Sequence, residues 1–319
     1  MGSIASVLAQ RIALGLLLLF LVSLLIFVGT ILLPGDVAQQ ILGQSATPEA
    51  LANLREELGV NRPPVERYLD WLGGLLTGDL GTALTSGQDI NEAIGRRLAN
   101  TLFLAFWAAI IAVPLAIFLG LLAVRYRDRW PDKSISATTL TTISMPEFVI
   151  GYILMFILGV KLNWFSPTAV GYRPDADLLT RLDSIAIPIL VLTLVVLAHM
   201  MRMTRAAILN VMQSAYIETA ELKGLTRFAV ISRHAFPNSI SPVINVIMLN
   251  LAYLVVGVVV VEVVFVYPGM GQYLVDHVTK RDIPVVQACG MIFATIYIGL
   301  NLIADLVSIL ANPRLRHPR

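Results

Sequence analysis

The sequence has few charged residues. Asp, Glu, Lys and Arg make up 14% of the 319 residues, whereas hydrophobic residues make up 57%. Soluble globular domains carry roughly 25% charged residues. With so little charge, most of the chain must face lipid or other apolar helices. The net charge is only +2, which gives no reason to expect a nucleic-acid partner.

Cysteine and histidine are also scarce. Cys289 is the single cysteine, which excludes an intramolecular disulfide and a cysteine-based metal site. The four histidines lie far apart in the sequence, with no spacing typical of a metal site or a nucleophile–base pair. The phosphate-binding sequence GxxxxGK[ST] is absent as well. We therefore expect no metal site and no catalytic residue on this chain.

Long apolar runs are abundant. A helix that crosses a bilayer needs about 20 apolar residues, and six runs lie near 12–33, 99–124, 136–160, 185–203, 239–265 and 285–310. The sequence predicts an all-α polytopic membrane protein with six transmembrane helices. The first run is too long for the apolar region of a signal peptide and lacks a cleavage site, so we interpret it as a retained span.

The distribution of basic residues predicts the orientation. If the N-terminus is cytoplasmic, 13 of the 23 Lys and Arg residues fall in short cytoplasmic segments, and ten are spread over much longer external segments. Basic residues are enriched in cytoplasmic loops. Both termini are therefore expected in the cytoplasm.

Three acidic residues lie within or at the edge of the spans. Glu147 follows Pro146, and a proline kinks a helix and frees a backbone carbonyl. Acids inside a membrane are often functional, so Glu147 is a candidate for the transport pathway, although a role at the kink is the plainer interpretation. Glu262 and Asp305 lie nearer the membrane edges, where structural pairing is expected.

Other polar residues of the third and fifth spans are candidate pore-lining positions. They are Thr139, Thr142, Ser144, Asn245 and Asn250. Such groups can equally be hidden in hydrogen bonds between helices, which we favour for any single one of them.

Two loops are longer than a simple connection requires. Segment 34–98 contains a helix-starting Thr47-Pro48-Glu49 and an amphipathic stretch, Tyr68 to Leu75, suited to the membrane surface. It is either a passive cap or a docking surface for a soluble partner. Segment 204–238 contains two helical stretches around Gly224, which can adopt a positive φ. A rigid lever needs such a helix–bend–helix, although a solvated connector has the same composition.

The spacing of residues in segment 204–238 matches a known pattern. Glu218-Thr219-Ala220 is followed by Gly224, then by His234 and Pro237. This order resembles the EAA loop of ABC import permeases, E-A-A-x3-G-x9-I-x-L-P. Thr219 replaces the second residue of the pattern, and His234 replaces the usual Ile, while the Glu-to-Gly-to-Pro spacing is kept.

Further motifs, between residues 11 and 316, make the chain similar to the permeases of the dipeptide, oligopeptide and nickel import group. They include Leu33-Pro34-Gly35-Asp36, Gly78-Asp79-Leu80-Gly81, Glu262-x2-Phe265-x2-Pro268-Gly269-x-Gly271, Arg281-Asp282-x-Pro284 and Asn312-Pro313-Arg314. The family more often has Asp where Asn312 stands.

The resemblance implies a type I ABC importer permease fold in a bacterial-type cytoplasmic membrane. Residues 1–98 would hold the first span and the extracytoplasmic loop, 99–310 the core permease domain, and 311–319 a cytoplasmic tail. The expected partners are a second homologous permease, two ABC ATPase subunits and a solute-binding protein. ATP and Mg would be bound by the ATPases, and no cofactor by this chain, which would be a transport subunit and not an enzyme.

The same resemblance assigns roles to residues. Coupling to the ATPases would involve Glu218, Thr219, Ala220, Gly224, His234 and Pro237. An extracytoplasmic gate or structural motif would involve Glu262, Phe265, Pro268, Gly269 and Gly271. Peptides or peptide-like solutes are the expected cargo, with nickel complexes, opines or sugars as alternatives. An ion-coupled secondary transporter would show interrupted helices in two matched repeats, and an intramembrane enzyme would show clustered catalytic residues; we find neither pattern.

Overall fold

The computed structural model describes residues 4–32, 37–43 and 46–311. The motif at 33–36 and the tail at 312–319 lie outside the described residues. Nearly all of the described chain is helical, and its one strand-like feature is an isolated bridge between Thr82 and Asp89. The helices are α1 Ile4–Leu32, α2 Val37–Leu42, α3 Pro48–Glu57, α4 Pro64–Thr77, α5 Ile90–Arg125, α6 Trp130–Ser144, α7 Glu147–Leu154, α8 Leu178–Ser184, α9 Ala186–Met212, α10 Ala215–Leu222, α11 Arg227–Val230, α12 Phe236–Phe265, α13 Met270–Thr279 and α14 Ile283–Ala311.

Six predicted spans correspond to five continuous helices and one broken pair. Helices α1, α5, α9, α12 and α14 are each long and apolar enough to cross a membrane, with α11 continuing into α12 through a π-helical turn at Ile231–Ala235. The third span consists of α6, then α7 with its π-helical extension, Met155–Lys161, and the two parts meet at 105°. Met145 and Pro146 adopt extended backbone angles, which ends α6 there. The kink expected at Pro146 is thus a complete break of the helix within the third span.

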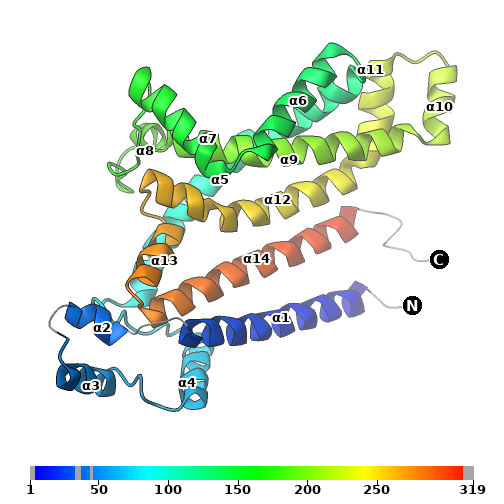
Figure 1. Cartoon of the computed structure of the whole chain (residues 1–319). Coiled ribbons are helices and arrows are strands. Elements are labelled where there is room, and N and C mark those ends of the chain that lie inside the picture. Colours follow the sequence, from blue (N-terminus) through cyan, green and yellow to red (C-terminus); the bar gives the residue numbers. More distant parts are fainter. Residues whose placement is uncertain (1–3, 33–36, 44–45, 312–319) are drawn as a thin grey trace.

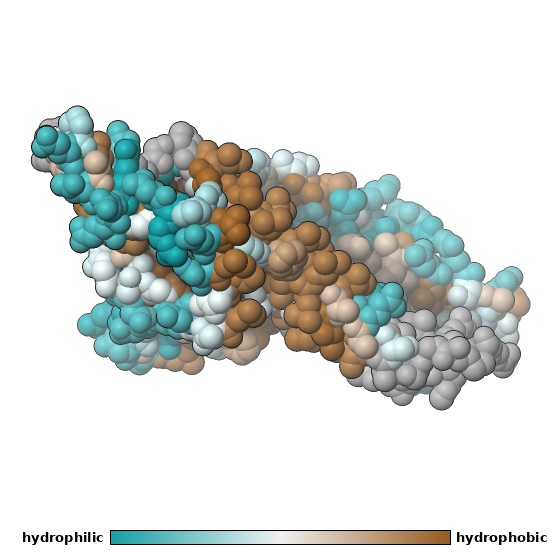
Figure 2. Space-filling view, turned by 90° about the horizontal axis from the view of Figure 1, so that it is seen from below, coloured by the Kyte–Doolittle hydropathy of each residue, from teal (hydrophilic) through white to brown (hydrophobic). Residues whose placement is uncertain are grey.

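The spanning helices lie side by side in the order α1, α14, α12, α9 and α5 (Figure 1). Only 11% of the apolar window of α1 is buried, compared with 61% for α9. Helix α9 is thus the centre of the bundle, and α1 is an edge helix held chiefly by α14. Figure 2 shows the consequence on the surface, a continuous hydrophobic belt between two hydrophilic ends.

Several helices extend beyond their apolar runs. Helix α5 begins at Ile90 instead of 99, and α9 continues to Met212 instead of ending at 203. In the extension of α9, Thr204 and Ile208 are fully buried, which shows why the helix continues although its outer face becomes charged. The expected loop 204–238 is therefore shorter, because its first nine residues belong to α9.

The segment between the first two spans forms a small cap, α2 to α4 with the loop to residue 89. Thr47 accepts a hydrogen bond from the Ala50 amide at 3.2 Å, as the N-cap prediction requires. Helix α4 has two apolar faces. Tyr68 and Trp71 pack against Phe27 of α1, while Val65, Leu69 and Leu76 remain exposed. Only this second face is free to contact a membrane surface.

Candidate functional site

The predicted lever forms a compact unit at one end of the bundle. It comprises residues 213–235, hereafter the coupling segment, and lies at the same end as the start of α6 and the end of α14 (Figure 1). The inner side of α10 is apolar, since Ile217 and Ala220 are buried in one cluster with Val124 of α5 and Ile208 of α9. The Arg227 guanidinium also donates to the Val124 carbonyl at 3.3 Å. The coupling segment is thus packed on the ends of two spanning helices.

The opposite side of α10 has no partner within the described chain. Glu218 and Thr219 are exposed on it, and Leu222 is 83% exposed. An isolated exposed leucine is common, but this one lies on the outer side of a helix whose inner side is firmly packed. Ala220 faces inward, so of the Glu218-Thr219-Ala220 triplet only the first two residues are available to another protein.

Gly224 ends α10 in a geometry that a side chain would oppose. Its φ is +78°, in the left-handed region. The Gly224 amide donates to the Glu221 carbonyl at 2.9 Å, and the Leu225 amide donates to the Ala220 carbonyl at 3.4 Å. This bond pair is the Schellman motif, which usually places glycine at the position after the helix end. The predicted bend with positive φ is confirmed, and Thr226 then caps α11 by accepting from the Ala229 amide at 3.3 Å.

The last two residues of the predicted motif lie away from the outer face of α10. His234 belongs to the π-helical turn Ile231–Ala235 and is half-buried. Pro237 lies in the first turn of α12, directly after the π-helical turn. These residues carry the coupling segment into α12 instead of extending its exposed surface.

A buried polar cluster lies at the other end of α12. The Glu262 carboxylate is fully buried and accepts from the Thr101 hydroxyl at 2.6 Å. Its second oxygen accepts from the backbone amides of Gly271 at 2.7 Å and Gln272 at 3.1 Å. These bonds connect α5, α12 and α13, as structural pairing of Glu262 requires, while its part in an extracytoplasmic gate stays a prediction.

The glycines of this motif are required by close contacts. A Cβ at Gly269 would overlap the Glu262 carboxylate, and a Cβ at Gly271 would lie 2.6 Å from the Val259 Cα atom. Phe265 is also fully buried, and its carbonyl accepts from the Ala169 amide at 2.7 Å. The pattern Glu-x2-Phe-x2-Pro-Gly-x-Gly therefore encodes one tightly packed turn.

The sequence did not reveal the partners of this cluster. The Asn100 side-chain amide donates to the Pro268 carbonyl at 2.9 Å, and the Asn100 backbone carbonyl accepts from the Tyr267 hydroxyl at 2.8 Å. Burial raises the pKa of Tyr267 well above its ordinary value, so this hydroxyl stays a hydrogen-bond donor. The available signal was the polar pair Asn100-Thr101 at the start of an apolar run, which marks a buried hydrogen-bonding position.

The candidate pore residues do not form one surface. The Thr139, Thr142 and Ser144 hydroxyls each donate to a carbonyl one turn earlier in α6. Thr139 and Thr142 line a cavity of about 240 Å³ between α5, α6 and α9. The Asn250 amide likewise bonds within its own helix, to the Val246 carbonyl at 2.8 Å. The polar groups are thus satisfied mainly within single helices, and not between helices as we favoured.

Glu147 and Asn245 lie elsewhere, near the open side of α12. Asn245 shares one side of α12 with Leu249 and Tyr253, which are 43% and 48% exposed. Glu147 is the first residue of α7, which packs against α12. No hydrogen bond or ion pair of the Glu147 side chain occurs among the described residues. Its carboxylate is therefore available to a ligand.

Two ion pairs stabilise the end of the bundle that carries the coupling segment. Arg205 holds Asp132 through two bonds of 2.9 and 2.8 Å, and Asp132 is buried. Arg11 pairs with Asp305 at 2.8 Å, which confirms structural pairing for Asp305. Within the described residues, no group of three or more His, Cys, Asp or Glu side chains is arranged to hold a metal ion.

Comparison with known proteins identifies the class. Residues 112–317 match the family model described as "Binding-protein-dependent transport system inner membrane component", and residues 4–105 match the model of its N-terminal part. The chain belongs to this family.

Similar proteins refine the class. A Brucella abortus protein named as a peptide transport system permease is 36% identical over 309 residues, covering 97% of this chain and 98% of that protein. The glutathione transport system permease protein GsiC of Salmonella typhimurium is 36% identical over 299 residues, covering 94% and 95%. Inward-facing MetNI, a methionine ABC transporter, shares the fold with a TM-score of 0.52 and 16% identity, covering 67% of this chain and 95% of that chain.

The chain is the membrane-spanning permease subunit of an ABC importer. Its relatives are named as transport system permeases. The expected family and the all-α permease fold are thereby confirmed.

Proposed function

We propose that this permease forms half of a translocation pore for peptides or peptide-like solutes. Relatives named as peptide and glutathione permeases, each aligned over nearly their whole length, support this cargo class. A solute-binding protein would deliver the cargo, and a second homologous permease would complete the pore. The other cargoes that the sequence left open, nickel complexes, opines and sugars, remain alternatives.

The coupling segment would receive work from an ATPase. Its inner side is packed on α5 and α9, whereas its outer side exposes Glu218, Thr219 and Leu222. This asymmetry is the observation that supports the proposal most directly, because a lever must be rigid toward its own bundle and open toward its partner. Two ATPase subunits would bind ATP and Mg, and closure of the ATPase pair would push on α10.

The orientation follows from the same assignment. The coupling segment would lie in the cytoplasm, together with the basic residues Arg125, Arg127, Arg129 and Arg233. The cap, α8 and α13 lie at the other end of the bundle (Figure 1), which would face the outside. In this orientation the Glu262 cluster joins the extracytoplasmic ends of three helices, where a gate would be built.

The translocation pathway would follow the open side of α12. Asn245, Leu249 and Tyr253 lie along it, and Glu147 approaches from the break between α6 and α7. A carboxylate without a protein partner at this position would attract the ammonium group of a peptide. Thr139 and Thr142 face the interior between α6 and α9, so we assign them a packing role.

The coupling proposal is tested by replacing Leu222 with Asp in the reconstituted importer. We expect ATP-driven uptake to fall at least tenfold, because a charge would be placed in an apolar docking contact, while the thermal stability of the complex stays unchanged. Leu179→Asp is the matched control, since Leu179 is 78% exposed on α8 at the opposite end. Equal uptake by both variants would refute docking through the outer side of α10.

The cargo proposal is tested separately. The importer is purified through this chain, the co-eluting binding protein is identified, and its ligands are screened by thermal shift with peptides, nickel complexes, opines and sugars. A shift with a short peptide supports the proposal. A shift with a sugar and none with peptides would replace the cargo while leaving the coupling mechanism intact.

A further inference from the structure

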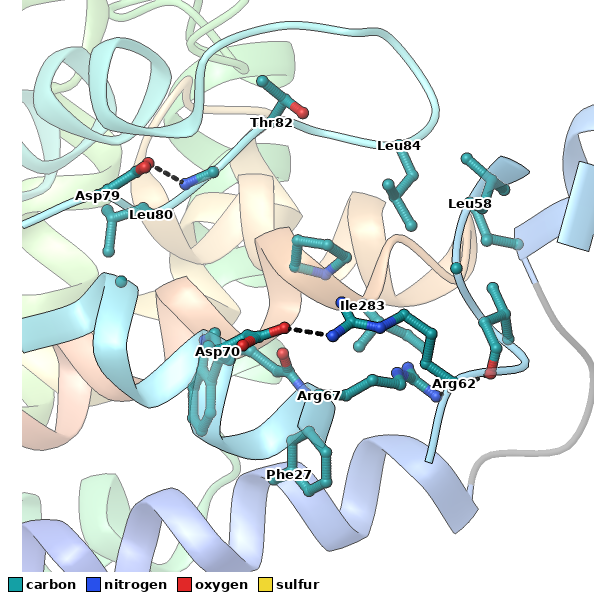
Figure 3. A pocket seen from close by; sticks show the side chains of 18 residues that line it. Phe27, Leu58, Arg62, Arg67, Asp70, Asp79, Leu80, Thr82, Leu84 and Ile283 are labelled. Carbon is teal, nitrogen blue, oxygen red and sulfur yellow. Dashed lines mark hydrogen bonds and ion pairs between the residues drawn. The ribbon is translucent and has the colours of Figure 1, made fainter. Parts of the chain in front are cut away.

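A cavity of about 400 Å³ lies between the cap and the start of α14 (Figure 3). Its lining comes from α1, the start of α2, the α3–α4 connection, α4, the segment 79–84 and the first turns of α14. No lining residue belongs to α6, α7, α10 or α12, so the cavity is separate from both the coupling segment and the open side of α12. Its volume lies within the roughly 300–1,000 Å³ of small-molecule pockets.

One side of the cavity carries a cation with spare hydrogen-bond donors. Arg62 is neutralised by Asp70, with 2.7 Å between the guanidinium and the carboxylate. Arg67, which lies one turn before Asp70 on α4, donates only to the Val60 carbonyl at 3.2 Å. It forms no ion pair with any described residue. Burial and the neighbouring Arg62 lower the pKa of Arg67, which is the effect expected when no carboxylate compensates the charge. Both guanidinium groups point toward the cavity in Figure 3.

A second, opposite charge also lines the cavity. Asp79 accepts from the Gly81 amide at 2.9 Å through one carboxylate oxygen. Among the described residues it has no basic partner. The lining therefore holds one balanced pair, Arg62 with Asp70, and two unbalanced charges of opposite sign, Arg67 and Asp79.

The cavity also has an apolar wall. The rings of Phe27 and Trp71 are stacked, with centroids 6.1 Å apart and planes inclined by 24°. Leu84, Ile283 and Pro284 complete the lining around them. Such a wall can bury an apolar side chain of a ligand.

The position of the charges favours a ligand from water. On α4 the exposed Val65, Leu69 and Leu76 follow one helical face, whereas Arg67 and Asp70 lie on the opposite face. If the face with Val65, Leu69 and Leu76 contacts the membrane surface, the cavity opens away from the lipid.

We propose that this cavity binds a short zwitterionic peptide, with its carboxylate on Arg67, its ammonium group near Asp79 and an apolar side chain on Trp71. The ligand connects α4 to the segment 79–84, beside the first turns of α14, so the cavity is an accessory solute site outside the pathway. The shared chemistry is an oxyanion and an ammonium group on one molecule, which a phosphatidylethanolamine headgroup also carries. The peptide class is common to this inference and to the proposed cargo, but the site itself does not depend on the coupling mechanism.

The test measures binding of the dipeptide Ala-Phe to the importer complex purified through this chain, in phosphatidylcholine nanodiscs without ATP or binding protein. Isothermal titration is repeated with Ala-Phe amide, which lacks the carboxylate, and with N-acetyl-Ala-Phe, which lacks the ammonium group. We expect saturable binding of Ala-Phe and roughly tenfold weaker binding of each blocked peptide, since a charged hydrogen bond is lost in each case.

Variants assign the binding to this cavity. Arg67→Gln should weaken Ala-Phe binding roughly tenfold and remove the preference for the free carboxylate over the amide. Asp79→Asn should instead remove the preference for the free ammonium group, which gives a second variant if the first folds poorly. Arg173→Gln is the control, because it removes a charge from an exposed residue before α8 that does not line the cavity.

Two outcomes would overturn the proposal. One is unchanged binding and unchanged preferences in both cavity variants. The other is binding of Ala-Phe that disappears when phosphatidylethanolamine is added to the nanodiscs and is not restored at higher peptide concentration, which would assign the cavity to a lipid headgroup. Uptake of Ala-Phe measured in parallel separates this proposal from the proposed cargo. If the wild-type importer binds Ala-Phe in an Arg67-dependent way but does not import it, only the proposed cargo is refuted.

Discussion

Substitution of Gly224 tests whether the bend after α10 transmits work. The residue has φ +78°, and a Cβ built there meets no atom within 4 Å. A Cβ at this position therefore encounters no steric obstacle. The only cost is conformational, which makes this position unusually clean for relating backbone geometry to transport.

The size of the effect follows from the left-handed conformation. An L-residue there costs about 1–2 kcal/mol, which is a factor of roughly 5–30 in the population of the bent loop. Asn tolerates the conformation better than Ala, and a β-branched residue tolerates it least. Gly224→Asn should therefore remain close to wild type, Gly224→Ala should be intermediate and Gly224→Val should lose most coupling.

The assay reconstitutes each variant with its partners and measures both uptake and stimulated ATP hydrolysis. Uptake per ATP hydrolysed should fall in the order Asn, Ala, Val, whereas the melting temperature of the complex should change little, because the bend lies at the periphery. If Gly224→Val transported normally with full stimulation of the ATPase, the bend would have no role in coupling, and the coupling segment would be a passive connector.

Three further predictions concern packing and charge. Gly271→Ala should destabilise the chain by about 1–3 kcal/mol in thermal unfolding, because its Cβ would overlap the backbone of α12. Gly73→Ala is the control and should be neutral, because a Cβ there meets open space. Equal losses of stability in the two variants would contradict the packing argument. Asp132→Asn should lower the stability by about 1–3 kcal/mol, because Arg205 loses a bidentate partner that is itself buried; an unchanged melting temperature would show that the pair contributes nothing. Glu147→Gln should weaken uptake of peptides with a free ammonium group by less than tenfold, with little change for N-acetylated peptides; a complete loss of all uptake would instead make Glu147 indispensable to the pathway.

The spans could be predicted because their signal is local. About 20 apolar residues suffice to identify a crossing helix, and all six runs correspond to helices of the structure. The position of the break in the third span could be predicted, but its angle could not. Pro146 indicates a kink, whereas the 105° angle depends on packing of α6 and α7 against α9, which no local pattern contains.

In the candidate sites, too, features set by local sequence could be predicted, and features set by distant contacts could not. The bend at Gly224 was predictable because one residue determines it. The inward position of Ala220 was not, because it depends on contacts with Val124 and Ile208, about 100 and 12 residues earlier in the chain. The partners of Glu262 escaped prediction for the same reason, since Thr101 lies 161 residues away. The cavity beside Arg67 is likewise assembled from six separate parts of the chain.

The broken third span has a consequence for how the chain is assembled in a membrane. Helix α6 has 15 residues, and α7 with its π-helical extension has 8 and 7, so neither part alone can cross the bilayer core. The two parts are packed by α9, and α7 also by α12, and both of these helices follow them in the chain and are synthesised later. The broken span therefore reaches its final packing only when helices from the second half of the chain are present.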